Sequence, residues 1–157
     1  MRRLSVITAI SVLVITSAEK IHAQKSTLAG LPQGAIAATA NGFTLKAKIN
    51  GKPVKAHAMM PPDKAGEIVG FYDGDKYIGL PYDKRNMVAG KKFDFGNENA
   101  DLTTNDDTQV WNGRKGEMEI TKVIGQWVEG KFFFTGYSYD NKKKIQVSEG
   151  FFRIQMK

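Results

Sequence analysis

The sequence predicts an all-β protein, an antiparallel β-sandwich or a lipocalin-like barrel of about eight to nine short strands. Apolar and polar residues alternate along several short segments, and turn-forming residues separate these segments at intervals of roughly 8 to 12 residues. No segment shows the spacing of an amphipathic helix. Because 41% of the 157 residues are hydrophobic and 25% are charged, the chain has the composition of a globular domain rather than of a disordered one.

The N-terminal residues resemble a secretory signal peptide. Arg2 and Arg3 precede an apolar run, residues 4–18, which has about the length of a signal-peptide core and is short of the roughly 20 residues that a spanning helix needs. We therefore assign residues 1–23 to a signal peptide that is cleaved between Ala23 and Gln24, and we expect export to the periplasm or the extracellular space. An uncleaved membrane anchor is the alternative interpretation of this run.

Charge and cysteine content limit the possible functions of the exported chain. There is no cysteine, so no disulfide, thiol nucleophile or lipid-modified N-terminal cysteine is available, and packing alone must stabilise the domain. Cleavage removes three basic residues and one acidic residue, which lowers the net charge from +7 to +5. Because these charges are dispersed, we predict no nucleic-acid partner.

A flexible leader, residues 24–42, is expected to precede a single antiparallel β-domain, residues 43–157. The domain opens with alternating residues around Asn50-Gly51, a pair that favours a type I′ hairpin turn. A second hairpin is predicted around Asp73-Gly74-Asp75, and a short strand places Phe93 and Phe95 on one side.

The C-terminal part contains three further expected features. The polar segment from Asn97 to Asp107 is predicted to be a long loop, and two strands are expected around a turn at Asn112-Gly113. In the last hairpin Phe132 and Phe134 share the inward phase. Because Phe152, Ile154 and Met156 are one residue out of step with Ile145 and Val147, we predict a bulge at Glu149-Gly150, in which the glycine takes the positive φ.

Three of these strands resemble a family of small exported Gram-negative bacterial proteins that is catalogued as a domain of unknown function. The segments are "GEMEIT" (116–121), "VEGKFFF" (128–134) and "VSEGFFRI" (147–154), and "FTLKAKINGKPVKA" from Phe43 is similar to the family's first hairpin, with Val54 where an aromatic residue is common. The resemblance implies an all-β exported domain and implies no activity.

The sequence offers few residues for catalysis. His57 is the only histidine after the signal peptide; we expect it to be exposed on the outward side of its strand and not to act as a general base. Glu117, Glu119 and Glu129 could supply the carboxylate pair of a glycoside hydrolase, but alternation places Glu117 and Glu119 on the solvent face of an ordinary strand. We therefore predict no catalytic residues.

A metal site is conceivable only in the acidic loop. Asn97, Asn99, Asp101, Asp106 and Asp107 have the oxygen ligands that calcium prefers, but their spacing does not follow the EF-hand pattern. The turn at Asp73-Gly74-Asp75 is also interpreted as a hairpin. We predict no metal ligands, no cofactor-binding residues and no cofactor, and the sequence leaves open whether the loop binds calcium.

The stretch "GKFFFTGYSYDNKKK" (130–144) combines aromatic side chains with three lysines. Phe133, Tyr137 and Tyr139 fall on the face opposite Phe132 and Phe134, where they form either a second packed layer or an exposed stacking platform. Lys142, Lys143 and Lys144 fall in the turn, where charge keeps a hairpin soluble. We interpret the stretch as a core hairpin with a soluble tip.

We infer a non-enzymatic exported domain that binds an envelope protein, a glycan or a small ligand, or has a structural role in the cell envelope. A lipocalin-like carrier of a small apolar ligand and a carboxylate-dependent envelope hydrolase are the alternatives. No membrane span is expected after the signal peptide is removed.

Cleavage of the signal peptide gives a first prediction. The protein recovered from the cell envelope is expected to begin at Gln24 or within a few residues of it, because Ala23 is the small residue that follows the apolar run. Intact-mass measurement checks this, and a full-length mass from the cytoplasm would refute it.

Overall fold

The computed structural model describes residues 28–96, 100–103 and 110–156, and these residues form an all-β domain. All the described strands belong to one antiparallel sheet, in the order β1-β4-β5-β6-β8-β9-β10-β11-β2-β3, with β7 paired to β9. The strands are β1 (Ile36–Ala37), β2 (Thr44–Ile49), β3 (Lys52–Lys55), β4 (Ala58–Met60), β5 (Glu67–Tyr72), β6 (Lys76–Pro81), β7 (Lys92–Asp94), β8 (Ala100–Thr103), β9 (Val110–Ile124), β10 (Trp127–Tyr137) and β11 (Lys144–Gln155). The described helical segments are short: α2 (Pro62–Ala65), η1 (Thr39–Asn41) and η2 (Lys84–Asn86).

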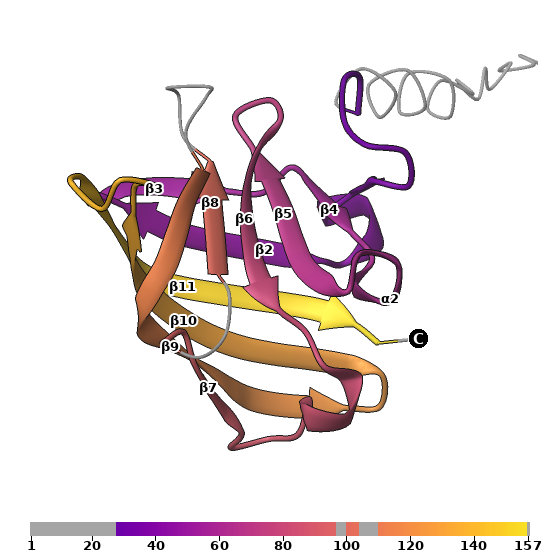
Figure 1. Cartoon of the computed structure of the whole chain (residues 1–157). Helices are drawn as coiled ribbons and strands as arrows, with labels where there is room; N and C mark the ends of the chain where they lie inside the picture. The colour runs from indigo at the N-terminus through magenta and orange to yellow at the C-terminus, as the bar shows by residue number, and fades with distance from the viewer. Residues whose placement is uncertain (1–27, 97–99, 104–109, 157) are drawn as a thin grey trace, which may run out of the picture.

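The sheet is curled into a half-barrel (Figure 1). Its two ends meet where the chain passes from β3 to β4. The Ala56 N–H donates to the Leu45 carbonyl of β2 at 2.8 Å, and the next residue, His57, donates to the Phe71 carbonyl of β5 at 2.9 Å. One curled sheet therefore takes the place of the two separate sheets of a sandwich.

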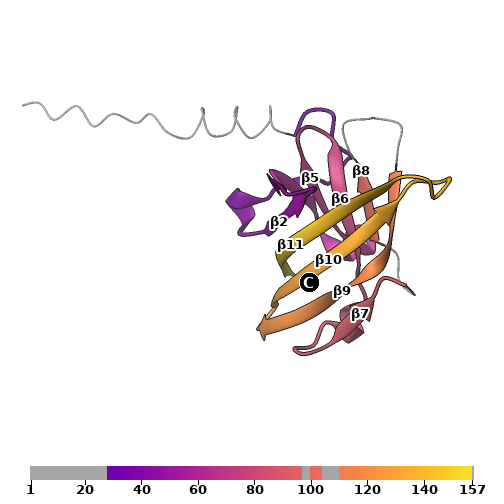
Figure 2. The ribbon, with the colours of Figure 1, turned by 90° about the vertical axis from the view of Figure 1, so that its left-hand side faces the viewer.

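The number and length of the strands differ from the sequence prediction. The described residues form 11 strands rather than eight or nine, and β9, β10 and β11 have 15, 11 and 12 residues. These three strands run side by side across the curve of the sheet (Figure 2). Register shifts interrupt the pairing of β9 with β10 at two places, and such irregularities let a long strand bend.

The two N-terminal hairpin turns are confirmed. Asn50 and Gly51 have φ of 46° and 80°, as a type I′ turn requires. Asp73 and Gly74 also have positive φ between β5 and β6. β5 and β6 lie inside the sheet rather than at its ends.

The hairpin predicted at Asn112-Gly113 is wrong, because β9 continues straight through this pair. A Cβ on Gly113 would lie 2.8 Å from the Ala100 Cβ and 2.9 Å from the Phe134 ring. Glycine is therefore needed at this position for the close approach of β8 and of an aromatic ring. The turn comes later, at Gly125, whose φ is 56°.

The predicted bulge in β11 is confirmed, although a different residue takes the unusual conformation. Phe132 pairs with Gly150 and Phe134 with Val147, so β11 has one extra residue between these pairs. Glu149, and not Gly150, has the positive φ, 51°. Gly150 is required for space, because a Cβ there would lie 2.6 Å from the Phe132 ring.

The core is built from phenylalanine rings that lie over glycines of the neighbouring strand. Two such pairs are in register, Gly130 with Phe152 and Gly150 with Phe132, and a third glycine, Gly113, lies against the Phe134 ring. A Cβ on any of these glycines would overlap the backbone or the ring opposite. Phe132 and Phe134 are almost fully buried, as predicted. The Phe95 ring packs edge to face against the Phe134 ring, with 5.6 Å between the two ring centroids.

Part of the predicted leader belongs to the sheet. Ile36 and Ala37 of β1 pair with Met59 and Ala58 of β4, and Ala38 is buried. The predicted signal peptide and residues 24–27 lie outside the described residues. No helix within the described segments is long and apolar enough to cross a bilayer.

Candidate functional site

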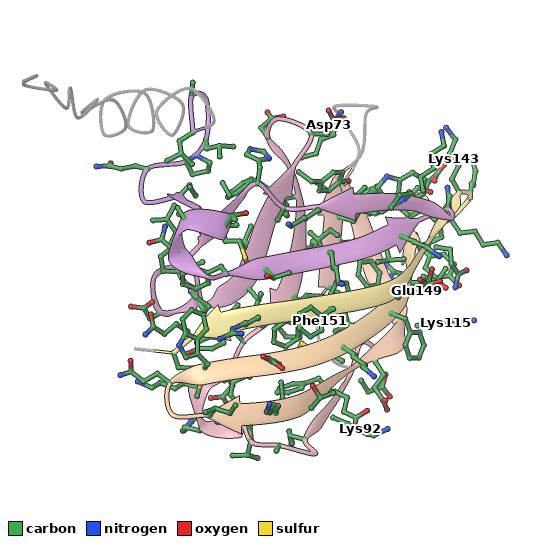
Figure 3. The ribbon with its side chains drawn as sticks, turned by 180° about the vertical axis from the view of Figure 1, so that it is seen from behind. Asp73, Lys92, Lys115, Lys143, Glu149 and Phe151 are labelled. Carbon is green, nitrogen blue, oxygen red and sulfur yellow. The ribbon has the colours of Figure 1, made fainter. Side chains whose placement is uncertain are left out.

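A concave site lies at one end of the curled sheet and is called the mouth pocket here. It has a volume of about 660 Å³ and is bordered by the β2–β3, β5–β6 and β10–β11 turns and the start of β9. Figure 3 shows Asp73, of the β5–β6 turn, and Lys143, of the β10–β11 turn, toward this end of the molecule. The lining residues are Ile49, Asn50, Lys52, Pro53, Val54, Tyr72, Asp73, Trp111, Lys144 and Ile145.

Large, mostly buried side chains form the floor of the mouth pocket. Tyr72, Trp111 and Ile145 are each only 6% or 7% exposed, although all three line the pocket. Gly136 brings two of them together, because a Cβ at this position would lie 2.9 Å from Ile145 and 3.1 Å from the Trp111 Cβ. The floor therefore presents an indole and a phenol ring on a fixed, well-packed base.

The rim of the mouth pocket is polar and carries a positive charge excess. Asp73 accepts a 2.6 Å bond from the Lys76 ammonium group, which balances the charge of its carboxylate. Lys52 and Lys144 are exposed at the rim, and neither makes a salt bridge within the described part of the chain. The pocket thus combines an aromatic floor with two ammonium groups.

The structure places the three carboxylates proposed for hydrolysis on the outer face of the sheet, away from the mouth pocket. Glu117 pairs with Lys92 at 2.8 Å, and Glu129 lies 3.6 Å from Arg153. Glu119 is opposite Lys131 of β10 and Lys92 of β7 in the sheet register. Each carboxylate therefore has a cation beside it, as on the solvent face of an ordinary sheet.

A different carboxylate pair, which the sequence did not indicate, gathers on the outer face of β5, β6 and β8. A Cβ on Gly79 would lie 3.4 Å from Glu67 Oε2 and 3.7 Å from the Asp101 Cβ, so both side chains border this glycine. Burial raises the pKa of Asp101, and burial together with the charge of Asp101 raises the pKa of Glu67. Burial and the same two carboxylates raise the pKa of Tyr77.

The remaining candidate residues are not brought together into a site. His57, expected to be exposed, is half-buried at the β3–β4 crossing, where its carbonyl accepts from the Ala38 N–H at 3.0 Å. Of the acidic-loop candidates, Asp101 lies in β8, whereas Asn97, Asn99, Asp106 and Asp107 lie outside the described residues. No group of three or more His, Asp or Glu side chains that could hold a metal ion is present among residues 28–96, 100–103 and 110–156.

The aromatic hairpin has the alternation that the sequence predicted. Phe133 of β10 is 52% exposed and alternates with the buried Phe132 and Phe134, whereas Tyr139 is 91% exposed in the turn that follows β10. The turn is organised by Asp140, which accepts from the Ser138 hydroxyl at 2.7 Å and from the Lys142 N–H at 3.1 Å. Lys142 and Lys143 are exposed at this tip.

Comparison of the chain with known protein families, with curated proteins and with solved structures finds no match.

The sequence did not indicate that Trp111 and Ile145 line one pocket. The expected turn at Asn112-Gly113 hid the alternation in which Trp111 and Gly113 point inward and Val110 and Asn112 do not. That alternation is visible in the sequence once Gly113 is treated as a strand residue. The approach of Glu67 and Asp101, by contrast, depends on the pairing of β6 with β8, which no local pattern indicates.

The Glu67 and Asp101 carboxyls give a second prediction, on the pH dependence of stability. Because the folded state raises the pKa of Asp101 above 3.8, ionisation opposes folding as the pH rises. The Asp101→Asn variant is therefore expected to gain stability relative to the wild type as the pH rises from 3.8 and to keep a constant advantage above the raised pKa. Urea unfolding over this pH range measures the difference.

Asp83 supplies a control of the opposite sign. The Arg85 N–H bonded to its carboxylate lowers the pKa of Asp83, so the wild type should be more stable than Asp83→Asn at neutral pH and lose that advantage as the pH falls through the lowered pKa. Equal pH dependence of the two variants would contradict the raised pKa of Asp101 and the lowered pKa of Asp83.

Proposed function

We propose that this chain is an exported β-domain, a member of the family of small Gram-negative proteins that its strand motifs resemble, and that it binds a small ligand in the cell envelope through the mouth pocket. The observation that supports this most is the pocket itself: about 660 Å³, with Trp111 and Tyr72 in its floor. This volume lies within the range of small-molecule sites, which typically combine apolar walls with a few polar groups.

The filled interior argues against a ligand held inside the sheet, as in the lipocalin-like alternative. A carrier of that kind holds its ligand inside the barrel, whereas the interior here contains the Phe132, Phe134 and Phe152 rings, each at most 2% exposed. The ligand is therefore proposed to dock at the open end of the sheet, above these rings. This placement needs no movement of the core.

The lining favours a ligand with an aromatic or aliphatic body and an anionic group. The body would lie on Trp111 and Ile145, and the anionic group would reach Lys52 or Lys144 at the rim. Hydrogen bonds to a charged group are the stronger kind, so this contact would fix the orientation of the ligand. The proposal contains no catalytic step.

A carboxylate-dependent hydrolase is the second candidate, now based on Glu67 and Asp101. The raised pKa values of these neighbouring carboxyls are the supporting observation, because such shifts also occur in acid–base catalysis. Hydrolysis of glycans or esters by the purified chain, abolished by Glu67→Gln, would favour this candidate over the binding function.

Dye binding tests the mouth pocket directly. The chain has two tryptophans, so Trp127→Phe leaves Trp111 as the only indole. The dye 1-anilinonaphthalene-8-sulfonate, which has an aromatic body and an anionic group, is expected to quench Trp111 fluorescence on binding. Val54→Glu, which places a negative charge in the pocket wall, should weaken this binding by about ten-fold or more, since burying an unpaired charge is costly.

A matched variant controls for a general charge effect. Val88 is 55% exposed and does not line the mouth pocket, so Val88→Glu should leave the dye affinity within about two-fold, as surface changes usually do. An equal loss in both variants, or no quenching of Trp111, would refute binding at this site.

A further inference from the structure

A second concave region lies on the outer face of the sheet, between β2 and β3, and is called the lysine hollow here. It has a volume of about 350 Å³, and its lining residues are Lys46, Ala47, Lys48, Pro53, Val54, Lys55 and Glu149. Glu149 and Phe151 mark the neighbouring strand β11 on this face (Figure 3). The lysine hollow shares Pro53 and Val54 with the mouth pocket, whereas Lys46, Lys48, Lys55 and Glu149 line only the hollow.

The charges of the lysine hollow are only partly balanced. Lys48 pairs with Glu149 at 2.8 Å, but Lys46 and Lys55 are directly opposite each other in the register of β2 and β3. Like charges at directly opposite positions destabilise a sheet. Among the described residues neither Lys46 nor Lys55 forms a salt bridge, so an anion from outside the chain would relieve their repulsion.

The basic surface continues across the sheet as a row of side chains at matching register positions. Lys46 is opposite Phe151 of β11, and Phe151 is opposite Lys131 of β10. Glu119 of β9, opposite Lys131 on its other side, ends the row. With neighbouring strands about 4.8 Å apart, the row from Lys55 to Lys131 crosses four strands and roughly 14 Å. This length suits several successive charges of a polymer better than one small anion.

Aromatic rings hold some of these cations in place. The Lys46 ammonium lies 5.5 Å from the centre of the Phe151 ring, and the Arg153 guanidinium lies 4.7 Å from the centre of the Trp127 ring. Each ring therefore has a cation over one of its faces. Stacking of successive nucleotide bases requires several open aromatic faces beside the basic groove, whereas Phe133 is the one exposed aromatic ring among the described residues of β2, β3, β10 and β11, which makes single-stranded nucleic acid a poor fit.

An anionic membrane is also a poor fit, because insertion requires exposed apolar side chains next to the charges. Among the described residues of β2, β3, β10 and β11, Phe133 is the one exposed large apolar side chain.

We propose that the row formed by Lys55, Lys46 and Lys131, with the lysine hollow at one end, binds an acidic polysaccharide. The carboxylates or sulfates of the polymer would lie along the row.

Binding to polygalacturonate, a linear polymer of carboxylated sugars, tests this proposal, with neutral dextran as the reference. The Lys46→Gln/Lys55→Gln variant should bind polygalacturonate about ten-fold or more weakly and show a smaller dependence of affinity on salt, since fewer counterions are released. Its thermal unfolding temperature should change little, because the substitutions remove both a like-charge pair and the favourable contact of Lys46 with the Phe151 ring.

A control variant has the same change in net charge. Lys115 and Lys143 are exposed and do not line the lysine hollow, and they lie apart from Phe151 in Figure 3. Lys115→Gln/Lys143→Gln should keep the polygalacturonate affinity within about two-fold, as distant surface changes generally do. Equal losses in both variants, or no binding of the wild type at low salt, would overturn the proposal.

Two further measurements decide between classes of partner. Tighter binding of an oligothymidylate than of polygalacturonate would overturn the choice of a polysaccharide in favour of nucleic acid. Preferential binding to vesicles of phosphatidylglycerol and phosphatidylcholine in equal parts would overturn it in favour of a membrane surface. At equal ionic strength, the proposal requires the oligothymidylate and the vesicles to bind more weakly than polygalacturonate.

Discussion

The contact between phenylalanine rings and glycines on neighbouring strands is the constraint on which the rest of the structure depends. Gly130 of β10 faces Phe152 of β11, and Gly150 of β11 faces Phe132 of β10. Each of the two strands therefore supplies a ring that lies over a glycine of the other. Gly113 makes room for Phe134 in the same way. Because interiors are packed at crystal-like density, rings of this size fit inside a tightly curled sheet only where a neighbouring residue lacks a side chain.

This constraint also determines where a ligand can bind. The rings fill the centre of the half-barrel, so space remains at its end, where Gly136 lets Trp111 and Ile145 approach and form the floor of the mouth pocket. The bulge at Glu149 restores the inward direction of Phe152, and it leaves Glu149 on the outer face beside Lys48. The core and both proposed binding surfaces therefore depend on β10 and β11.

Local patterns in the sequence predicted the all-β class, two hairpin turns and the β11 bulge, because alternation and positive-φ residue types act over a few neighbours. They failed at Asn112-Gly113 and in the detail of Gly150, where glycine serves to admit a ring from another strand. They also could not indicate the approach of Glu67 to Asp101 or of Lys46 to Lys55. These contacts are made by the register of the strands, which the whole sheet determines.

A double-mutant cycle on Gly130 and Phe152 tests the central constraint most directly. Gly130→Ala alone should destabilise the protein by about 1–3 kcal/mol, as overpacking does, because its methyl group would overlap the Phe152 ring. In the Phe152→Leu background the same substitution should cost at least about 1 kcal/mol less, a coupling expected of residues in direct contact. Costs that add within about 0.5 kcal/mol would contradict the account.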